Sequence, residues 1–224
     1  MDVGDMAQTL RPPSSPNLPV GPVEYAQDYQ NQFTKILRLY FNEVDNTLSV
    51  LLENNGGRYL NFPHIAASDS TNQYAAADNI PTLINWNTEE SDGGFDLTLT
   101  YAAAIYSGVY RIDYSLEFVN TDNAAHDVLV WLKVNGSNIA RSATKFTVPS
   151  RKSVGNNGYL CAVSFIIFAV NAGDQIQLYW ETDKAYNTVG PVNGVYMYAT
   201  AANATHPAIP SAVGSITFVS ELPQ

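Results

Sequence analysis

The sequence predicts a mainly β protein: an antiparallel jelly-roll sandwich preceded by one long α-helix and an extended proline-rich N-terminal arm. Three observations support this prediction. Prolines recur through residues 1–22, an apolar pattern with the helical period runs through residues 23–55, and alternating segments with turn signals fill residues 58–224. Short strands at this spacing, with no helical stretch among them, are typical of sandwiches and jelly rolls.

Composition limits the classes of function. The chain has 224 residues, 46% of them hydrophobic, and its 21 acidic and 11 basic side chains give a net charge of −10. This length allows one substantial core plus an appendage. The acids are scattered, and no run of Lys or Arg exceeds the pair Arg151-Lys152. The charge therefore indicates solubility, and no nucleic-acid partner is expected.

The N-terminus, MDVGDMAQTLRPPSSP, lacks the basic start and the apolar run of a signal peptide. No apolar run approaches the ~20 residues that span a bilayer. We therefore expect a protein that is made in a cytoplasm and contacts no membrane. The single Cys161 cannot form an intramolecular disulfide, and its apolar surroundings, YLCAVSFIIFAV, predict a buried and inert thiol.

Residues 1–22 form the first element, which the prolines keep extended, because proline fixes φ and removes a hydrogen-bond donor. Two interpretations stay open for it. It is either a disordered tail or an arm that becomes ordered by lying against another protein. In the second interpretation, the anchoring residues are Leu10, Arg11, Pro12, Pro13, Pro16, Leu18 and Pro19.

Residues 23–55 form the second element, an amphipathic helix that Gly56-Gly57 would end. Its apolar side chains recur every three or four residues, so one face is continuously apolar. The predicted contact residues are Tyr29, Phe33, Ile36, Leu37, Tyr40, Val44, Leu48 and Leu51. The pattern favours a short, imperfect coiled coil between copies of the chain. Packing against the chain's own β domain or against a partner protein stays open.

Residues 58–224 form the third element, in which the clearest strand is GVYRIDYSLEFVN. Its inward side chains are predicted to be Tyr110, Ile112, Tyr114, Leu116 and Phe118, with Arg111, Asp113, Ser115 and Glu117 on the other face. Asn135-Gly136 predicts a hairpin turn. Ala172-Gly173-Asp174 predicts a second turn between two strands, and SAVGSITFVSEL predicts the last strand.

Two segments, Val128–Val134 and Ala162–Val170, are apolar on both faces. A strand whose outer face meets water alternates between apolar and polar side chains, so these strands do not fit a solvated face. We therefore predict that a neighbouring subunit covers part of them, with Trp131, Phe165 and Ile167 in the contact.

Residues that could carry chemistry form no recognised active site. His64, His126 and His206 lie far apart and in no metal-ligand spacing. The sequence has no nucleophile elbow, P-loop or dinucleotide-binding glycine pattern. We expect a protein that is not an enzyme and needs no cofactor.

The best metal candidate is TEESDGGFD, whose Glu89, Glu90, Asp92 and Asp96 offer carboxylate oxygens. It lacks the spacing of a calcium loop, so the sequence predicts a solvated hairpin loop and no metal. The carboxylate of Asp174, at a tight turn, is expected to accept hydrogen bonds from local backbone N–H groups.

Five stretches resemble, in order, the jelly-roll modules of the tumour-necrosis-factor and complement globular-head superfamily, in the version common in virion proteins of tailed phages, especially marine ones. They are HIAASDSTNQYAAADNIPTLINWNT, GGFDLTLTYAAAIYSGVYRIDYSLEF, VLVWLKVNGSNIARSATK, VNAGDQIQLYW and HPAIPSAVGSITFVS. The stretch YAQDYQNQFTKILRLYFNEVDN resembles the leading helix of such phage proteins.

The resemblance implies a homotrimer, because modules of this family associate about a threefold axis. It also implies a structural virion protein that is made in the host cytoplasm and assembled onto the outside of the particle. Such a capsid decoration, head fibre or knob would bind the major capsid protein or another virion protein through its arm. The alternative is a tail-fibre or receptor-binding tip that contacts a glycan or receptor on the host surface. Tail fibres are usually longer, and this chain has only one short helical shaft, so a position on the capsid is favoured over one on the tail.

Overall fold

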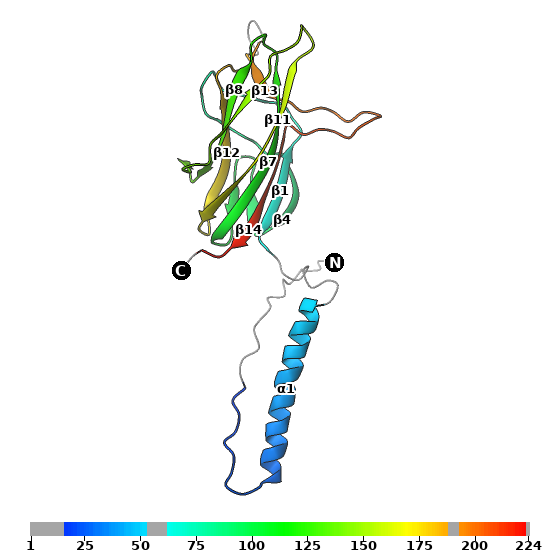
Figure 1. Ribbon diagram of the computed structural model, residues 1–224, viewed down its shortest axis with the longest axis vertical. Helices are drawn as coiled ribbons and strands as arrows, with labels where there is room; N and C mark the ends of the chain where they lie inside the picture. Colours follow the sequence, from blue (N-terminus) through cyan, green and yellow to red (C-terminus); the bar gives the residue numbers. More distant parts are fainter. Residues whose placement is uncertain (1–15, 53–61, 188–192, 223–224) are drawn as a thin grey trace. The chain divides into compact units, whose positions relative to one another are not determined.

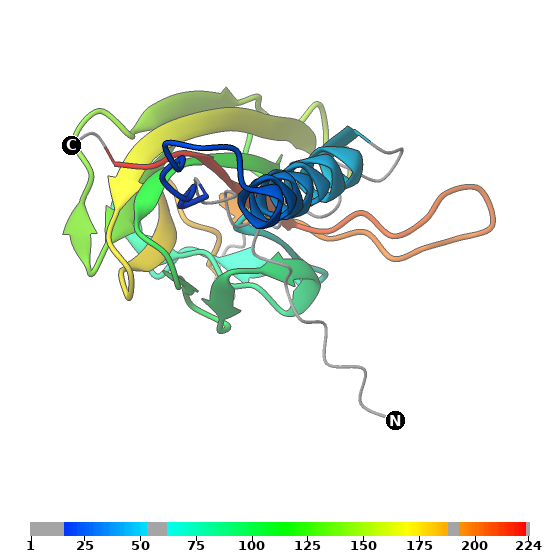
Figure 2. The same ribbon diagram turned by 90° about the horizontal axis from the view of Figure 1, so that it is seen from below.

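The computed structural model of the chain describes residues 16–52, 62–187 and 193–222 (Figures 1 and 2). The chain divides into two compact units, residues 1–61 and 62–224, which are described separately below. The predicted fold class is confirmed in these ranges: an antiparallel sandwich follows one helix, α1 (Gln27–Leu52).

Helix α1 starts at Gln27 rather than at the predicted residue 23. It begins where the Gln30 N–H donates to the Ala26 carbonyl at 3.2 Å, and Val23 and Tyr25 before it are exposed. Valine and tyrosine are poor helix formers, and without burial they do not extend the helix. Residues 53–55 and Gly56-Gly57 lie outside the described ranges. No helix in the described part of the chain has the length and apolar character needed to cross a membrane.

The second unit consists of two sheets. Sheet A runs β2-β13-β7-β14-β1-β4, and β11 also pairs with β7. Its strands are β1 (His64–Asp69), β2 (Gln73–Tyr74), β4 (Thr88–Gly93), β7 (Gly108–Asn120), β11 (Gly158–Val170), β13 (Val195–Met197) and β14 (Ala212–Ser220).

Sheet B runs β10-β8-β12-β6-β5, with β3 beside β12 and β9 beside β8. Its strands are β3 (Thr82–Leu83), β5 (Phe95–Leu97), β6 (Ala102–Ala104), β8 (His126–Val134), β9 (Ser137–Asn138), β10 (Thr144–Val148) and β12 (Gln175–Thr182). The chain crosses repeatedly from one sheet to the other: between β2 and β3, β3 and β4, β4 and β5, β6 and β7, β7 and β8, β10 and β11, β11 and β12, and β12 and β13. Antiparallel strands that alternate between two sheets in this way form a jelly roll.

Two predicted turns differ in what they connect. Asn135 and Gly136 have φ values of 51° and 77°, which fits the predicted hairpin turn. Its return strand, β9, has only two residues. The turn at Ala172-Gly173-Asp174 instead joins β11 to β12, which do not pair, because β11 lies in sheet A and β12 in sheet B. The local turn signal showed that the chain reverses but not which strands pair afterwards.

The core lies between the sheets and is organised by β7. Tyr110, Ile112, Tyr114, Leu116 and Phe118 are all buried, which confirms the predicted alternation. The Tyr110 ring packs edge-on against two other rings of the core, those of Phe95 and Phe218, at centroid distances of 5.3 and 5.6 Å. Across the core, Phe118 contacts Trp180 of sheet B at 5.3 Å. Edge-to-face pairs of this kind stabilise a core beyond their buried area.

We predict that Leu116→Ala lowers the free energy of unfolding of the β domain by about 2–5 kcal/mol, because Leu116 is fully buried and its truncation leaves a cavity. Urea denaturation followed by the β-sheet circular dichroism signal measures this loss. Val154→Ala, at a side chain that is 86% exposed, is the control and should change it by less than about 0.5 kcal/mol. Equal effects of the two variants would contradict the core assignment.

Candidate functional site

The outer face of sheet A exposes an apolar row along β11. Its outward side chains include Val163, Phe165 and Ile167, which are 65%, 57% and 55% exposed. Among the strands that the structure describes, β11 pairs only with β7 and leaves its other edge without a partner strand, and none of its 13 residues is charged. The predicted exposure of Phe165 and Ile167 to a neighbour agrees with this position. A long, uncharged edge strand is a template for contact with another chain.

Strand β7 supplies the polar part of the same face. The Arg111 guanidinium donates to Asp113 Oδ1 at 2.6 Å and lies 4.6 Å from the centre of the Phe165 ring. The ion pair is exposed, so it contributes little stability. It nevertheless removes net charge from this part of the face, and the guanidinium stacks on the aromatic ring.

Cys161 also lies on this outer face, which corrects the prediction of a buried thiol. The alternation of β11 turns it outward, because the inward positions of the strand are taken by residues such as Ala162. Its sulfur lies 3.2 Å from Ser115 Oγ. Partial burial against the sheet raises the pKa of the Cys161 thiol, so it is less readily ionised than a free cysteine.

A cluster of five tyrosines continues the face at the other end of sheet A. Its members are Tyr74, Tyr159, Tyr186, Tyr196 and Tyr198, with neighbouring ring centres 4.7 to 6.1 Å apart. Tyr196 lies at the centre, opposite Tyr74 on β2 and Val119 on β7. Burial, together with the four surrounding tyrosines, raises the pKa of Tyr196 to about 12.

Sequence reasoning did not find this tyrosine cluster. Its members are spread along the chain from Tyr74 to Tyr198. They meet because β11 and β13 both pair with β7, and β2 pairs with β13. Tyr159 belongs both to the cluster and to the apolar row of β11. The two features therefore form one continuous surface of sheet A, with aromatic residues at one end and aliphatic residues along β11.

Trp131, the third predicted contact residue of the β domain, does not lie on this surface. It is on the outer face of sheet B and only 8% exposed. Its indole N–H donates to Asn138 Oδ1 at 2.9 Å, and its ring lies 6.1 Å from the ring of Tyr179. The short β9 hairpin thus covers Trp131 within its own chain. The outer face of β8 also carries Asp127 and Lys133, so it is not apolar throughout as the sequence predicted.

Helix α1 has the predicted amphipathic face. The half-buried side chains of this stripe are Tyr29, Phe33, Ile36, Leu37, Tyr40 and Val44. Leu48 is exposed, and nothing is described for the side chain of Leu51. Among the described side chains of α1, none is fully buried. The apolar stripe is therefore only partly covered within one chain.

Part of the predicted anchoring arm is described. The Tyr29 hydroxyl donates to the Pro19 carbonyl at 3.3 Å, and Leu18 is 41% exposed. Pro16 and Pro19 are in non-helical backbone, as the sequence predicts. Leu10, Arg11, Pro12 and Pro13 lie outside the described residues.

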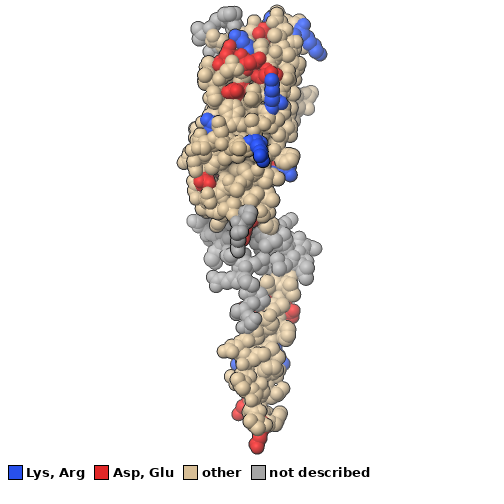
Figure 3. Space-filling view, turned by 60° about the vertical axis from the view of Figure 1, so that its left-hand side comes forward, with Lys and Arg blue, Asp and Glu red and all other residues tan. Residues whose placement is uncertain are grey.

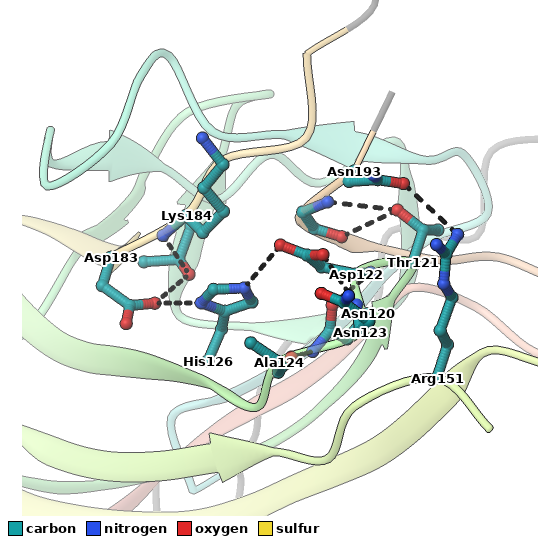
Figure 4. A network of polar contacts seen from close by, with 12 residues as sticks. Asn120, Thr121, Asp122, Asn123, Ala124, His126, Arg151, Asp183, Lys184 and Asn193 are labelled. Atoms are coloured by element: carbon teal, nitrogen blue, oxygen red, sulfur yellow. Dashed lines mark hydrogen bonds and ion pairs between the residues drawn. The ribbon is translucent and has the colours of Figure 1, made fainter. Parts of the chain in front are cut away.

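A polar network ties the loop before β8 to the end of β12 (Figure 4). His126 lies between two carboxylates: its Nε2 is 3.2 Å from Asp122 Oδ2 and its Nδ1 is 3.2 Å from Asp183 Oδ1. The hydrogen bond from His126 and the Asn123 N–H hold the pKa of Asp122 below its usual range. These contacts join loops and offer no nucleophile among the described partners of His126.

The segment with the candidate metal-binding carboxylates belongs largely to a strand, and Glu90 takes part in a hydrogen bond within the sheet. Thr88–Gly93 is strand β4 at one edge of sheet A rather than the predicted hairpin loop, because it pairs with β1. Glu90 accepts a hydrogen bond from the Ser68 hydroxyl at 2.8 Å. Asp174 accepts from the Asn171 N–H and the Asn135 amide, both at 2.7 Å, which confirms its local role. No group of three or more His, Cys, Asp or Glu in the described ranges is placed to hold a metal ion.

No protein-family model and no curated protein matches the sequence. Among solved structures, the globular domain of a zebrafish complement 1qA protein aligns with 71% of this chain and 99% of its own, at 13% identity and a TM-score of 0.42. The Eiger TNF of S. frugiperda aligns with 73% of this chain and 96% of its own, at 9% identity and a TM-score of 0.45. The jelly-roll assignment rests on the strand order and pairing of the chain itself.

We predict that Tyr196→Phe weakens the alkaline destabilisation of the β domain. An unfolded tyrosine loses its proton at pH ~10, whereas folded Tyr196 keeps it until about pH 12. The stabilising contribution is therefore complete below pH ~10 and is lost as the pH rises towards 12. Tyrosinate absorbance and urea denaturation, both as functions of pH, measure the two effects.

The matched control for this prediction is Tyr25→Phe, at an exposed position outside the tyrosine cluster. It should leave the step of highest pH in the titration unchanged. A wild-type titration in which every tyrosine ionises together near pH ~10 would show that the cluster does not hold Tyr196 in its neutral form.

Proposed function

We propose that the chain is a structural protein of a tailed-phage virion that assembles as a homotrimer and decorates the capsid, anchored by residues 1–22. The observation that carries self-association is the outer face of sheet A, where β11 exposes Val163, Phe165 and Ile167 on an open and uncharged edge. Exposed apolar surfaces of this kind mark protein–protein contacts.

The two edges of sheet A are treated differently. Edge strand β4 (Thr88–Gly93) carries Glu89 and Glu90. Charges on an edge strand oppose pairing with another chain. Strand β11 lacks any such protection, so association is permitted at one edge and opposed at the other.

Helix α1 supplies the second proposed contact. Its apolar stripe, centred on Ile36 and Tyr40, is only half buried in one chain. Most of the stability of a helix in a protein comes from packing of its apolar face, so burying the stripe against the same helix of other copies would stabilise all of them.

The assignment to a phage virion is supported by the resemblance of the five β-domain stretches and of the leading helix to phage virion proteins. The alternative, a receptor-binding tip at the end of a tail fibre, uses the same trimer and differs in where the protein sits. A density map of the particle distinguishes the two, because it shows this protein either on the head or on the tail. Its absence from purified particles would refute both.

We predict that light scattering of the purified chain gives about three times 24.5 kDa, and that Val163→Asp shifts this value towards one chain. Val163 is exposed in the single chain, so the substitution does not disturb the core, but it places like charges together in the proposed contact. The matched control is Val154→Asp, the same substitution at an exposed site in the loop between β10 and β11. A trimer unaffected by Val163→Asp would exclude this face.

We predict that deletion of residues 1–22 leaves the trimer mass and the β-sheet signal unchanged but abolishes attachment to particles. The deletion removes the hydrogen bond from the Tyr29 hydroxyl to the Pro19 carbonyl. The prolines form no core of their own, so the anchoring contacts would be with another virion protein. The measurement is co-sedimentation of the truncated protein with particles that lack the wild-type chain. Normal decoration by the truncated protein would contradict anchoring by the arm.

A further inference from the structure

Residues 199–210, between β13 and β14, form a projecting hairpin that the sandwich itself does not use. Figures 1 and 2 show it in orange, extending away from the body of the β domain in both views. Its two sides are joined by Thr200 and Ile209, each of which donates its N–H to the other's carbonyl at 2.9 Å. We call it the 199–210 arm.

The base of the 199–210 arm is fixed to sheet A at one residue of β7. The Glu117 carbonyl accepts from the Tyr198 N–H at 2.8 Å, and the Glu117 N–H donates to the Ser211 carbonyl at 2.9 Å. The Ala199 N–H donates to Asn72 Oδ1 at 2.9 Å. Both ends of the arm are therefore held by the sheet, at the point where β7 changes its partner from β14 to β13.

The tip of the arm is fixed as well. Asn203 Oδ1 accepts from the N–H and hydroxyl of Thr205, both at 2.8 Å, and from the His206 N–H at 3.1 Å. The His206 ring is held between the Asn203 amide and the Pro207 carbonyl, each at 2.7 Å. A hairpin with a fixed base and tip loses little conformational entropy when it binds, which favours a binding role over a flexible linker.

Most exposed side chains of the arm are small and apolar, and the polar ones, Asn203 and Thr205, lie at its tip. Ala201, Ala202, Ala204, Ala208 and Ile209 are all exposed. The sequence from Ala185 to Ser220, which includes the arm, contains no Asp, Glu, Lys or Arg, although the whole chain carries 32 such residues, 21 acidic and 11 basic. Covering the apolar side chains of this uncharged, projecting element is favourable, because it removes apolar surface from water.

The charge distribution identifies the partner. Copies of a chain with a net charge of −10 repel one another, so a contact between them is least opposed where both surfaces are uncharged. In the β domain, the two longest segments without charge are residues 153–173, which contain β11, and residues 185–220, which contain the arm. On the face shown in Figure 3, charged side chains gather near the upper end of the β domain and much of the rest is uncharged.

The arm is also continuous with the proposed contact surface. It begins directly after Tyr198, whose ring lies 6.1 Å from that of Tyr159 on β11. We infer that the 199–210 arm of each copy reaches onto the uncharged row of β11, on the outer face of sheet A, in a neighbouring copy. This inference rests on the proposed homotrimer and adds to it a specific intersubunit element.

The test replaces residues 201–208 by Asn-Gly, which keeps the Thr200–Ile209 pair and closes it with a two-residue hairpin turn. Sedimentation over a dilution series measures the concentration at which the oligomer dissociates. We expect the shortened chain to dissociate at a concentration at least about tenfold higher than the wild type. Its β-sheet signal and the unfolding of the monomer should stay unchanged, since the arm contributes nothing to the core.

Two point variants make the test independent of any folding defect in the shortened chain. Ala202→Glu places a carboxylate on the arm at an exposed position and should weaken association. Ala140→Glu makes the same change at an exposed alanine in the loop between β9 and β10, and should not. Equal dissociation of the wild type, the shortened chain and Ala202→Glu would overturn the inference while the homotrimer stands. A wild type that is monomeric at every concentration would overturn the homotrimer itself.

Discussion

The β domain depends on the pairing of β7, which forms antiparallel ladders with β11 on one side and with β14 and β13 on the other. Side chains alternate along a strand, so the register of these ladders decides which residues enter the core and which reach the outer face. A slip by one residue would turn Tyr110 outward and drive Arg111 between the sheets. The register therefore fixes the core and the candidate contact surface together.

The same strand explains why the tyrosine cluster and the 199–210 arm lie side by side. The partner of β7 changes at Glu117. Strand β14 pairs with β7 up to Leu116, and β13 pairs with it from Phe118 onwards, on the same side. The chain between them has to leave the sheet at this junction, and it leaves as the arm. Tyr196 and Tyr198 come just before the arm in the chain, so the tyrosine cluster lies at the base of the arm.

Local patterns in the sequence were enough to predict the inward face of β7, the Asn135-Gly136 turn and the apolar stripe of α1, because each depends on neighbours within a few residues. They were not enough wherever a distant strand decides the outcome. The turn after β11 was seen, but the sheet that β12 joins was not. Cys161 was expected in the core because its surroundings are apolar on both faces, and only the ladder with β7 shows that it points outward. Trp131 was expected in a contact between subunits, although β9 covers it.

An open, uncharged strand such as β11 favours specific association and aggregation alike, since both use the same exposed edge and side chains. Specific association prevails over aggregation when another copy binds β11 in the correct arrangement before a non-specific contact forms. Helices that hold copies together raise the effective concentration of their β domains to the order of millimolar, so even a weak contact between faces becomes populated. If α1 joins the copies as proposed, the β11 face needs only modest affinity of its own. The acids on β4 then oppose growth from the opposite edge, which confines association to a closed assembly instead of an extending sheet.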